Sequence, residues 1–234
     1  MKKNIILSIV INMLILSRDM VSLPFTPVLQ EENVEQAFEN VLPAAVRLQA
    51  GEMYGSGSIY EITPEEVIVA TAGHLLSDGR QEWEVTFFDG EWAIGRPVDI
   101  SDEADVGFIE VSLSDLPKEE LMKLYRVTKN PHAWHDFNKN SRFFMIDMVS
   151  DDVESTYFQG ALVEKEMFLS DYGRIMMYGD AYAHSGMSGC GIFDGYGNFV
   201  GILSGATEQN EIAAVPLSEI EEAYKKPGLF QSEQ

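Results

Sequence analysis

Three short segments of the sequence carry side chains that could together activate a hydroxyl group. Ser188 lies in the string GMSGCG (residues 186–191), whose glycines allow a tight turn that directs backbone N–H groups toward the serine. His74 ends a short β-branched run, and a neutral histidine is the usual base for a serine hydroxyl. Asp105 directly precedes an apolar run, where a buried carboxylate needs a partner such as a histidine N–H. These residue types favour nucleophilic catalysis by serine.

Each segment also has a simpler explanation when it is taken alone. The glycine-rich string could be a hairpin turn, His74 a structural histidine, and Asp105 an exposed turn residue. From average glycine and serine usage, a G-x-S-G-x-G string is expected by chance in under about 1% of chains of this length. The presence of all three segments in one chain therefore favours the catalytic interpretation.

The elements that must position these residues are short strands separated by Gly, Pro and Asp signals, as in small barrels. The expected strands are 45–48, 57–62, 67–71, 84–88 and 106–111 in the first half, and 143–148, 159–169, 174–178, 191–193, 199–204 and 212–216 in the second. The expected helices are 33–41, one from Ser114 or Asp115 to about residue 126 between the halves, and one begun by the capping box Ser218-x-x-Glu221.

Together these segments resemble the trypsin-like (chymotrypsin-fold) serine peptidases, most closely the disulfide-free bacterial branch. The resemblance extends over about residues 44–224 and keeps the family's order of His, Asp and Ser. The glycine-rich segment 54–58 and the Asp89-Gly90 turn add to it. It implies an all-β fold of two six-stranded antiparallel β-barrels packed face to face, with a short C-terminal helix.

The resemblance also implies roles for particular residues. Ser188 would be the nucleophile, His74 the general base and then acid, and Asp105 the group that fixes the imidazole tautomer. The N–H groups of Gly186 and Ser188 would form the oxyanion hole. The residues expected to bind substrate are Tyr182, Ser204, Gly205 and Ala206.

Some positions depart from the family pattern. Gly73 stands where alanine is common, and Met187 stands where trypsins activated by a new N-terminal ammonium have aspartate, so we do not expect that activation. Cys190 replaces a glycine and is either a redox-sensitive group or a small buried apolar residue. Tyr182 occupies the position that is acidic in trypsin, so we expect no selection of Arg or Lys, unless a shifted loop brings in Asp180.

The expected domain plan follows from the ends of the chain. Residues 1–22 have a short basic start and an apolar run over 5–16, which predicts a signal peptide or membrane anchor. We therefore expect a secreted protein or one anchored at the outer face of the cell membrane, with possible membrane association through residues 5–16. The remaining expected boundaries are 23–43 for a linker and short helix and 44–234 for the peptidase domain, with barrels at about 44–113 and 140–217 and the last helix at about 218–226.

Composition excludes several classes of function. The net charge of −22 disfavours nucleic acid as a partner, because binding it requires Lys and Arg to neutralise phosphates. The single cysteine excludes an internal disulfide. We expect no metal and no cofactor, because His132-x-x-His135 lacks a third ligand and the Asp99, Asp102 and Asp105 set lacks the glycine and final glutamate of a calcium loop. The oligomeric state has no signal in the sequence.

The predicted function is that of a serine endopeptidase acting on protein or peptide substrates through an acyl-enzyme. A catalytically inert peptidase-like binding module is the alternative from another class, since a fold does not guarantee activity. Ester or other acyl transfer by the same residues is a further alternative. An α/β-hydrolase is disfavoured because Cys190 breaks the G-x-S-x-G motif.

Overall fold

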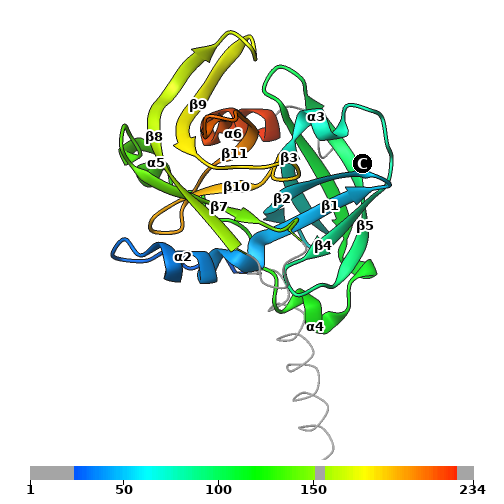
Figure 1. The fold of residues 1–234 in the computed structure, drawn as a ribbon. Coiled ribbons are helices and arrows are strands. Elements are labelled where there is room, and N and C mark those ends of the chain that lie inside the picture. The colour runs from blue at the N-terminus through cyan, green and yellow to red at the C-terminus, as the bar shows by residue number, and fades with distance from the viewer. Residues whose placement is uncertain (1–23, 151–155, 226–234) are drawn as a thin grey trace, which may run out of the picture.

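The computed structural model describes residues 24–150 and 156–225, which form two closed antiparallel β-barrels side by side (Figure 1). The first barrel has the order β1-β2-β3-β6-β5-β4 and consists of β1 Ala45–Ala50, β2 Met53–Ile62, β3 Glu66–Ala72, β4 Trp83–Phe87, β5 Trp92–Ser101 and β6 Val106–Ser112. The second has the order β10-β11-β12-β9-β8-β7 and consists of β7 Arg142–Asp147, β8 Thr156–Leu169, β9 Arg174–Ala181, β10 Gly191–Asp194, β11 Phe199–Ala206 and β12 Glu211–Pro216. Closure pairs every strand on both sides. The predicted fold class is confirmed.

Short helices lie outside the barrel walls. The N-cap of α2 (Val34–Val41) is Asn33, whose side chain accepts a hydrogen bond from Gln36 N at 3.2 Å. The last helix, α6 (Leu217–Lys225), follows β12 directly and buries Ile220 and Ala223. The others are η2 Leu42–Ala44, α3 Gly73–Leu76, η3 Leu113–Asp115, α4 Lys118–Leu121 and α5 Pro131–Asp136.

The connection between the barrels differs from the predicted helix that continues to about residue 126. The helical part ends early, at Leu121, in α4. Beyond it the backbone N–H of Arg126 donates to Pro24 O at 3.2 Å and that of Val127 to Ile59 O at 2.9 Å. These N–H groups are therefore engaged with distant segments and cannot continue a helix. Tertiary pairing overrides the local helical pattern here.

Strand β5 was not predicted, because its sequence contains Gly95, Pro97 and Asp99, which usually mark turns. The structure accommodates them through a register shift between Pro97 and Asp99 in the pairing of β5 with β6. A bulge is one of the few places where a strand tolerates proline. The helix α5 was also missed, although Asn130 caps it and Pro131 begins it.

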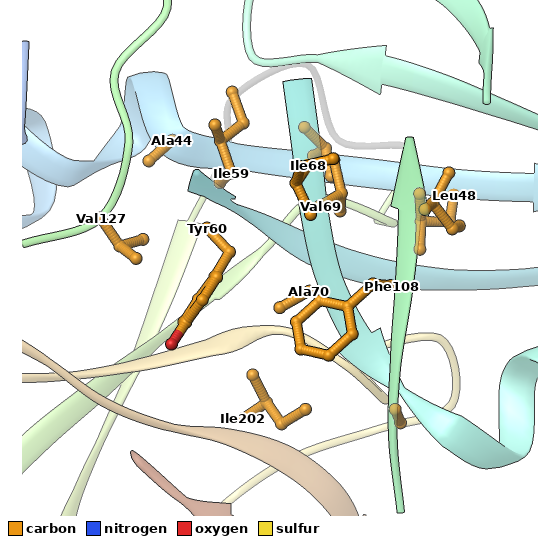
Figure 2. Packing of buried hydrophobic residues seen from close by; sticks show 14 of the residues in the cluster. Ala44, Leu48, Ile59, Tyr60, Ile68, Val69, Ala70, Phe108, Val127 and Ile202 are labelled. Atoms are coloured by element: carbon orange, nitrogen blue, oxygen red, sulfur yellow. The ribbon is translucent and has the colours of Figure 1, made fainter. Parts of the chain in front are cut away.

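The main hydrophobic core fills the first barrel and continues into the interface between the barrels. Figure 2 shows Tyr60 and Phe108 of the first barrel together with Ile202 of β11 in the second. The Tyr60 ring lies 6.2 Å from that of Phe199 in β11 and 4.9 Å from that of Tyr224 in α6. The two barrels are therefore joined by buried apolar packing, and residues on their facing walls hold fixed relative positions.

Among residues 24–150 and 156–225, no helix has both the length and the apolar character needed to cross a bilayer. The predicted signal peptide or membrane anchor at 1–22, with its apolar run at 5–16, lies outside the described residues.

Candidate active site

His74 lies where β3 turns into the one-turn helix α3. The Gly73 N–H donates to Asp105 O at 3.0 Å. A methyl group at Gly73 would lie 3.0 Å from the Val106 nitrogen, so the absence of a side chain allows this close approach of the two backbones. This backbone contact brings His74 against the residue that precedes β6.

The Asp105 carboxylate accepts hydrogen bonds from both the backbone and the ring of His74. The His74 N–H donates to Asp105 Oδ1 at 2.8 Å, and His74 Nδ1 lies 3.1 Å from each carboxylate oxygen. The Asp105 backbone has a φ of 56°, a left-handed conformation that aspartate adopts more readily than most residues. With its proton on Nδ1, a neutral His74 carries its lone pair on Nε2. The ring is half exposed, with 46% of the side chain accessible.

Ser204 supplies a further donor to the same carboxylate from the second barrel. Its hydroxyl donates to Asp105 Oδ2, and both side chains are buried. Burial alone would raise the pKa of Asp105, but the hydrogen bonds from His74 and Ser204 outweigh it and hold the pKa below its ordinary value. Asp105 is therefore a stable anion that orients the imidazole.

Ser188 lies in the loop between β9 and β10, which turns through Gly186 (φ 95°) and Gly189 (φ 85°). The Gly189 N–H donates to Leu203 O at 2.8 Å. A methyl group at Gly189 would overlap Thr71 Oγ1 and would lie 2.9 Å from the Ala72 nitrogen. The residue after Ser188 thus packs against the end of β3, directly before the helix that carries His74.

Ser56 in β2 fixes the same loop from the other side. Its N–H donates to Ser188 O and its hydroxyl to Gly186 O, both at 2.9 Å. The N–H groups of Gly186 and Ser188 have no acceptor within residues 24–150 and 156–225, as the predicted oxyanion hole requires. Sequence reasoning placed Ser56 in a glycine-rich strand but missed this contact.

The side chain of Ser188 is half-buried, and its hydroxyl forms no hydrogen bond within the described part of the chain. The structure therefore brings together the segments of His74, Asp105 and Ser188 and joins the first two residues directly. Catalytic hydrogen bonds to the nucleophile often tighten only when substrate binds. The catalytic roles of the three residues stay a prediction.

The predicted substrate-binding residues lie on the second barrel near this junction. Tyr182 is 50% exposed, and its ring meets that of Phe158 edge-on at 5.0 Å. Gly205 and Ala206 line a pocket of about 240 Å³ with Tyr172. The side chain of Ser204 points instead to Asp105, so only its backbone is available for the predicted substrate contact. Asp180 is exposed at the end of β9.

Met187 and Cys190 point into the core of the second barrel, where both are buried. Burial and the nearby charge of Asp147 raise the pKa of the Cys190 thiol. Because the thiolate is the reactive form, this environment favours the interpretation of Cys190 as a small buried apolar residue. Among the described residues, no group of three His, Cys, Asp or Glu side chains is placed to hold a metal ion.

No family model and no curated protein sequence matches the chain. Solved structures do. The structure of the HtrA-type protease AlgW with a tripeptide matches this chain with a TM-score of 0.68 and 20% sequence identity. The match covers 81% of this chain and 62% of the AlgW chain. Its complex with a decapeptide has a TM-score of 0.67 at 18% identity, over 82% and 66%. The M. tuberculosis H37Rv protein Rv3671c, a serine-to-alanine mutant in an inactive form, has a TM-score of 0.65 at 14% identity, over 90% and 98%.

This chain spans less than two thirds of the AlgW chain. At these sequence identities the structural similarity supports the fold, and the activity is a question for experiment. It agrees with the two six-stranded barrels and the short C-terminal helix described above. The chain therefore has the chymotrypsin-like fold, which it shares with HtrA-type serine proteases.

Proposed function

We propose that this protein is a serine endopeptidase with Ser188 as nucleophile, His74 as general base and Asp105 as the orienting acid. The observation that carries the proposal is the chain of hydrogen bonds from Ser204 through Asp105 to His74 Nδ1, which leaves Nε2 as the basic nitrogen. It occurs at the junction of two chymotrypsin-like barrels, beside the loop of Ser188. A carboxylate that orients an imidazole base beside a serine hydroxyl can perform acyl transfer.

In the proposed reaction, Ser188 Oγ attacks the carbonyl carbon of the substrate while His74 Nε2 takes the hydroxyl proton. The developing oxyanion accepts hydrogen bonds from the N–H groups of Gly186 and Ser188. His74 then gives the proton to the leaving amine, and an acyl group remains on Ser188. Water, deprotonated by His74, hydrolyses this ester and regenerates the enzyme. No cofactor takes part.

Peptides are the proposed substrates for two reasons. The AlgW structures to which this chain is similar contain a tripeptide and a decapeptide. In addition, Gly205 and Ala206 at the end of β11 pair with β12 but lie beyond the pairing with β10, and they border a pocket. This end of β11 gives an extended peptide backbone a strand edge to pair with and a place for a side chain. An ester substrate would use only the acyl-transfer part of this site.

The test is reaction of the full chain with a fluorophosphonate probe, together with cleavage of a diverse peptide library. Ser188→Ala should abolish both labelling and cleavage. Ser185→Ala is the matched control, because Ser185 is an exposed serine three residues away. Folded wild-type protein that neither takes the probe nor cleaves peptides would instead support the inert binding module. Turnover of esters without peptides would support the acyl-transfer alternative.

We also propose export of the protein across the cell membrane, on the basis of the sequence of residues 1–22 alone. Fractionation of cells that express the full chain tests this location. Protein found only in the cytoplasm would overturn it without affecting the proposed activity.

A further inference from the structure

A second histidine and aspartate are paired beside the Ser188 loop. His184 Nε2 lies 2.9 Å from Asp147 Oδ2. The Asp147 side chain is fully buried, whereas 27% of the His184 side chain is accessible. His184 begins the turn that leads to Ser188, and its carbonyl oxygen accepts a hydrogen bond from Met187 N at 3.1 Å. The proposed mechanism does not use this pair.

Asp147 ends β7 and holds the turn that follows. Its Oδ1 accepts the N–H groups of Val149 and Ser150 at 2.9 and 3.3 Å. Its Oδ2 accepts the Ser150 hydroxyl at 2.5 Å as well as His184. A buried carboxylate with these donors is held as an anion, and the pKa of Asp147 lies below its ordinary value because its hydrogen bonds outweigh the effect of burial.

Both ring nitrogens of His184 face acceptors. Nε2 faces the Asp147 carboxylate, and Nδ1 lies 2.9 Å from the Ser185 carbonyl oxygen. A neutral imidazole carries one N–H and can donate only one of these hydrogen bonds, whereas an imidazolium donates both. The observed arrangement therefore fits the protonated ring.

The same turn packs directly against the loop that contains the expected oxyanion hole. A methyl group at Gly186 would lie 2.7 Å from Val149 Cγ1 and 2.5 Å from the Tyr54 ring. Gly186 thus packs against both β2 and the turn that Asp147 organises. Met187 stands where trypsins activated by a new N-terminal ammonium have aspartate, so Asp147 and His184 bring charge to this loop from a different position.

We propose that Asp147 and protonated His184 are positioning residues that hold residues 184–188 in the conformation needed for catalysis, so that deprotonation of His184 loosens the oxyanion hole. This inference rests on the proposed function. It predicts that activity declines on the alkaline side through deprotonation of His184.

The groups around His184 favour its protonated form. Burial by itself lowers the pKa of His184, but the hydrogen bonds with Asp147 and Ser185 and the charge of Asp147 outweigh it and raise the pKa above its ordinary value. The other groups around the ring are the phenol of Tyr182, at 6.1 Å between ring centroids, and the uncharged ring of Phe158 in β8, at 6.0 Å. Asp147 is the only anion that affects His184 among the described residues.

The experiment is the pH profile of kcat/KM for peptide cleavage by the full chain. In His184→Gln the amide nitrogen reaches the position of Nε2 and keeps a donor to Asp147 that does not titrate, so the alkaline decline should disappear. In Asp147→Asn the decline should move to lower pH. His184→Ala should lose roughly 10²-fold in kcat with a smaller change in KM, about the effect of losing one oxyanion donor. His132→Gln, on the exposed helix α5, is the matched control and should keep the wild-type profile.

An alkaline decline in His184→Gln equal to that of wild type would overturn the inference, as would a kcat for His184→Ala within twofold of wild type. NMR titration of the Ser188→Ala protein provides a second measurement that needs no activity. The Gly186 amide resonance should titrate together with the His184 ring, and this dependence should vanish in the Ser188→Ala, His184→Gln protein. Absence of cleavage and labelling at every pH would overturn the proposed function, while the Gly186 titration would still decide the positioning role.

Discussion

The hydroxyl of Ser204, in β11 of the second barrel, donates a hydrogen bond to the carboxylate of Asp105, which precedes β6 of the first. This contact ties the residue that orients His74 to the barrel that carries Ser188. Because this hydrogen bond helps to lower the pKa of Asp105, the charged state of Asp105 depends on the packing of the two barrels against each other.

Ser204→Ala should lower kcat about tenfold and leave KM nearly unchanged, because a hydrogen bond to a charged group contributes about 1.5–3 kcal/mol and only part of this is expressed in the transition state. Steady-state kinetics on peptides measures the effect. Ser58→Ala is the matched control, since Ser58 is a buried serine whose hydroxyl has no partner in the described part of the chain. Equal kcat values for the two variants would remove Ser204 from the positioning of Asp105.

Asp105→Asn should fold like wild type and lower kcat by roughly 10⁴, as loss of the correct imidazole tautomer does in triads of this kind. The left-handed φ of 56° is also accessible to asparagine, so the backbone need not change. Circular dichroism and single-turnover acylation together test this. Wild-type acylation rates in the variant would show that Asp105 has no catalytic role.

The lowered pKa of Asp105 has a consequence for stability in acid. The charged form is favoured by folding, so its contribution is present above the ordinary aspartate pKa of about 3.9 and is lost as the pH falls through the lower pKa of the folded protein. Urea unfolding between about pH 5 and 2 should therefore show a steeper loss of unfolding free energy in wild type than in Asp105→Asn. Parallel curves for the two proteins would contradict the shift.

Gly189→Ala should destabilise the protein by more than about 2 kcal/mol, because strained backbone and an overpacked contact add together. Its methyl group would overlap Thr71 Oγ1 and the Ser56 carbonyl at a φ of 85°. Gly79→Ala is the control, since Gly79 has a φ of 79° and open space around it. Urea unfolding of both variants separates the packing effect from the backbone effect, and equal losses would show that the loop adapts.

Cleavage should not require Arg or Lys before the cleaved bond, because Tyr182 stands at the position of the acidic residue in trypsin and Asp180 is exposed. A peptide-library profile of wild type and Asp180→Ala tests this. A strong preference for Arg or Lys that disappears in Asp180→Ala would show that Asp180 selects the substrate.

Much of the fold could be predicted because the strands are short, β-rich and separated by clear turn residues. The run that leads to His74 and the run that follows Asp105 are strands β3 and β6, which pair with each other. Strand β5 could not be predicted in the same way, since the bulge that makes Pro97 acceptable exists only in the assembled sheet. The early end of α4 likewise depends on distant carbonyl groups that accept from residues 126 and 127.

The candidate site was predictable only where its residues lie in motifs. His74, Asp105 and Ser188 each follow or precede a recognisable strand or glycine turn. The contact of Ser204 with Asp105 joins residues 99 positions apart, and that of His184 with Asp147 joins residues 37 apart. No local pattern in the sequence indicates either contact, because the first forms across the junction of the two barrels and the second joins the end of β7 to the loop between β9 and β10 of the second barrel.

The division of the proposed machinery between the barrels has a consequence during synthesis of the chain. The base and its orienting acid are complete once residue 105 has been made, but the nucleophile and the hydroxyl that secures the acid lie at 188 and 204. A growing or truncated chain therefore holds at most half of a working centre. If the proposed function holds, a nascent chain is therefore inactive until residue 204 has been translated and the two barrels have packed against each other.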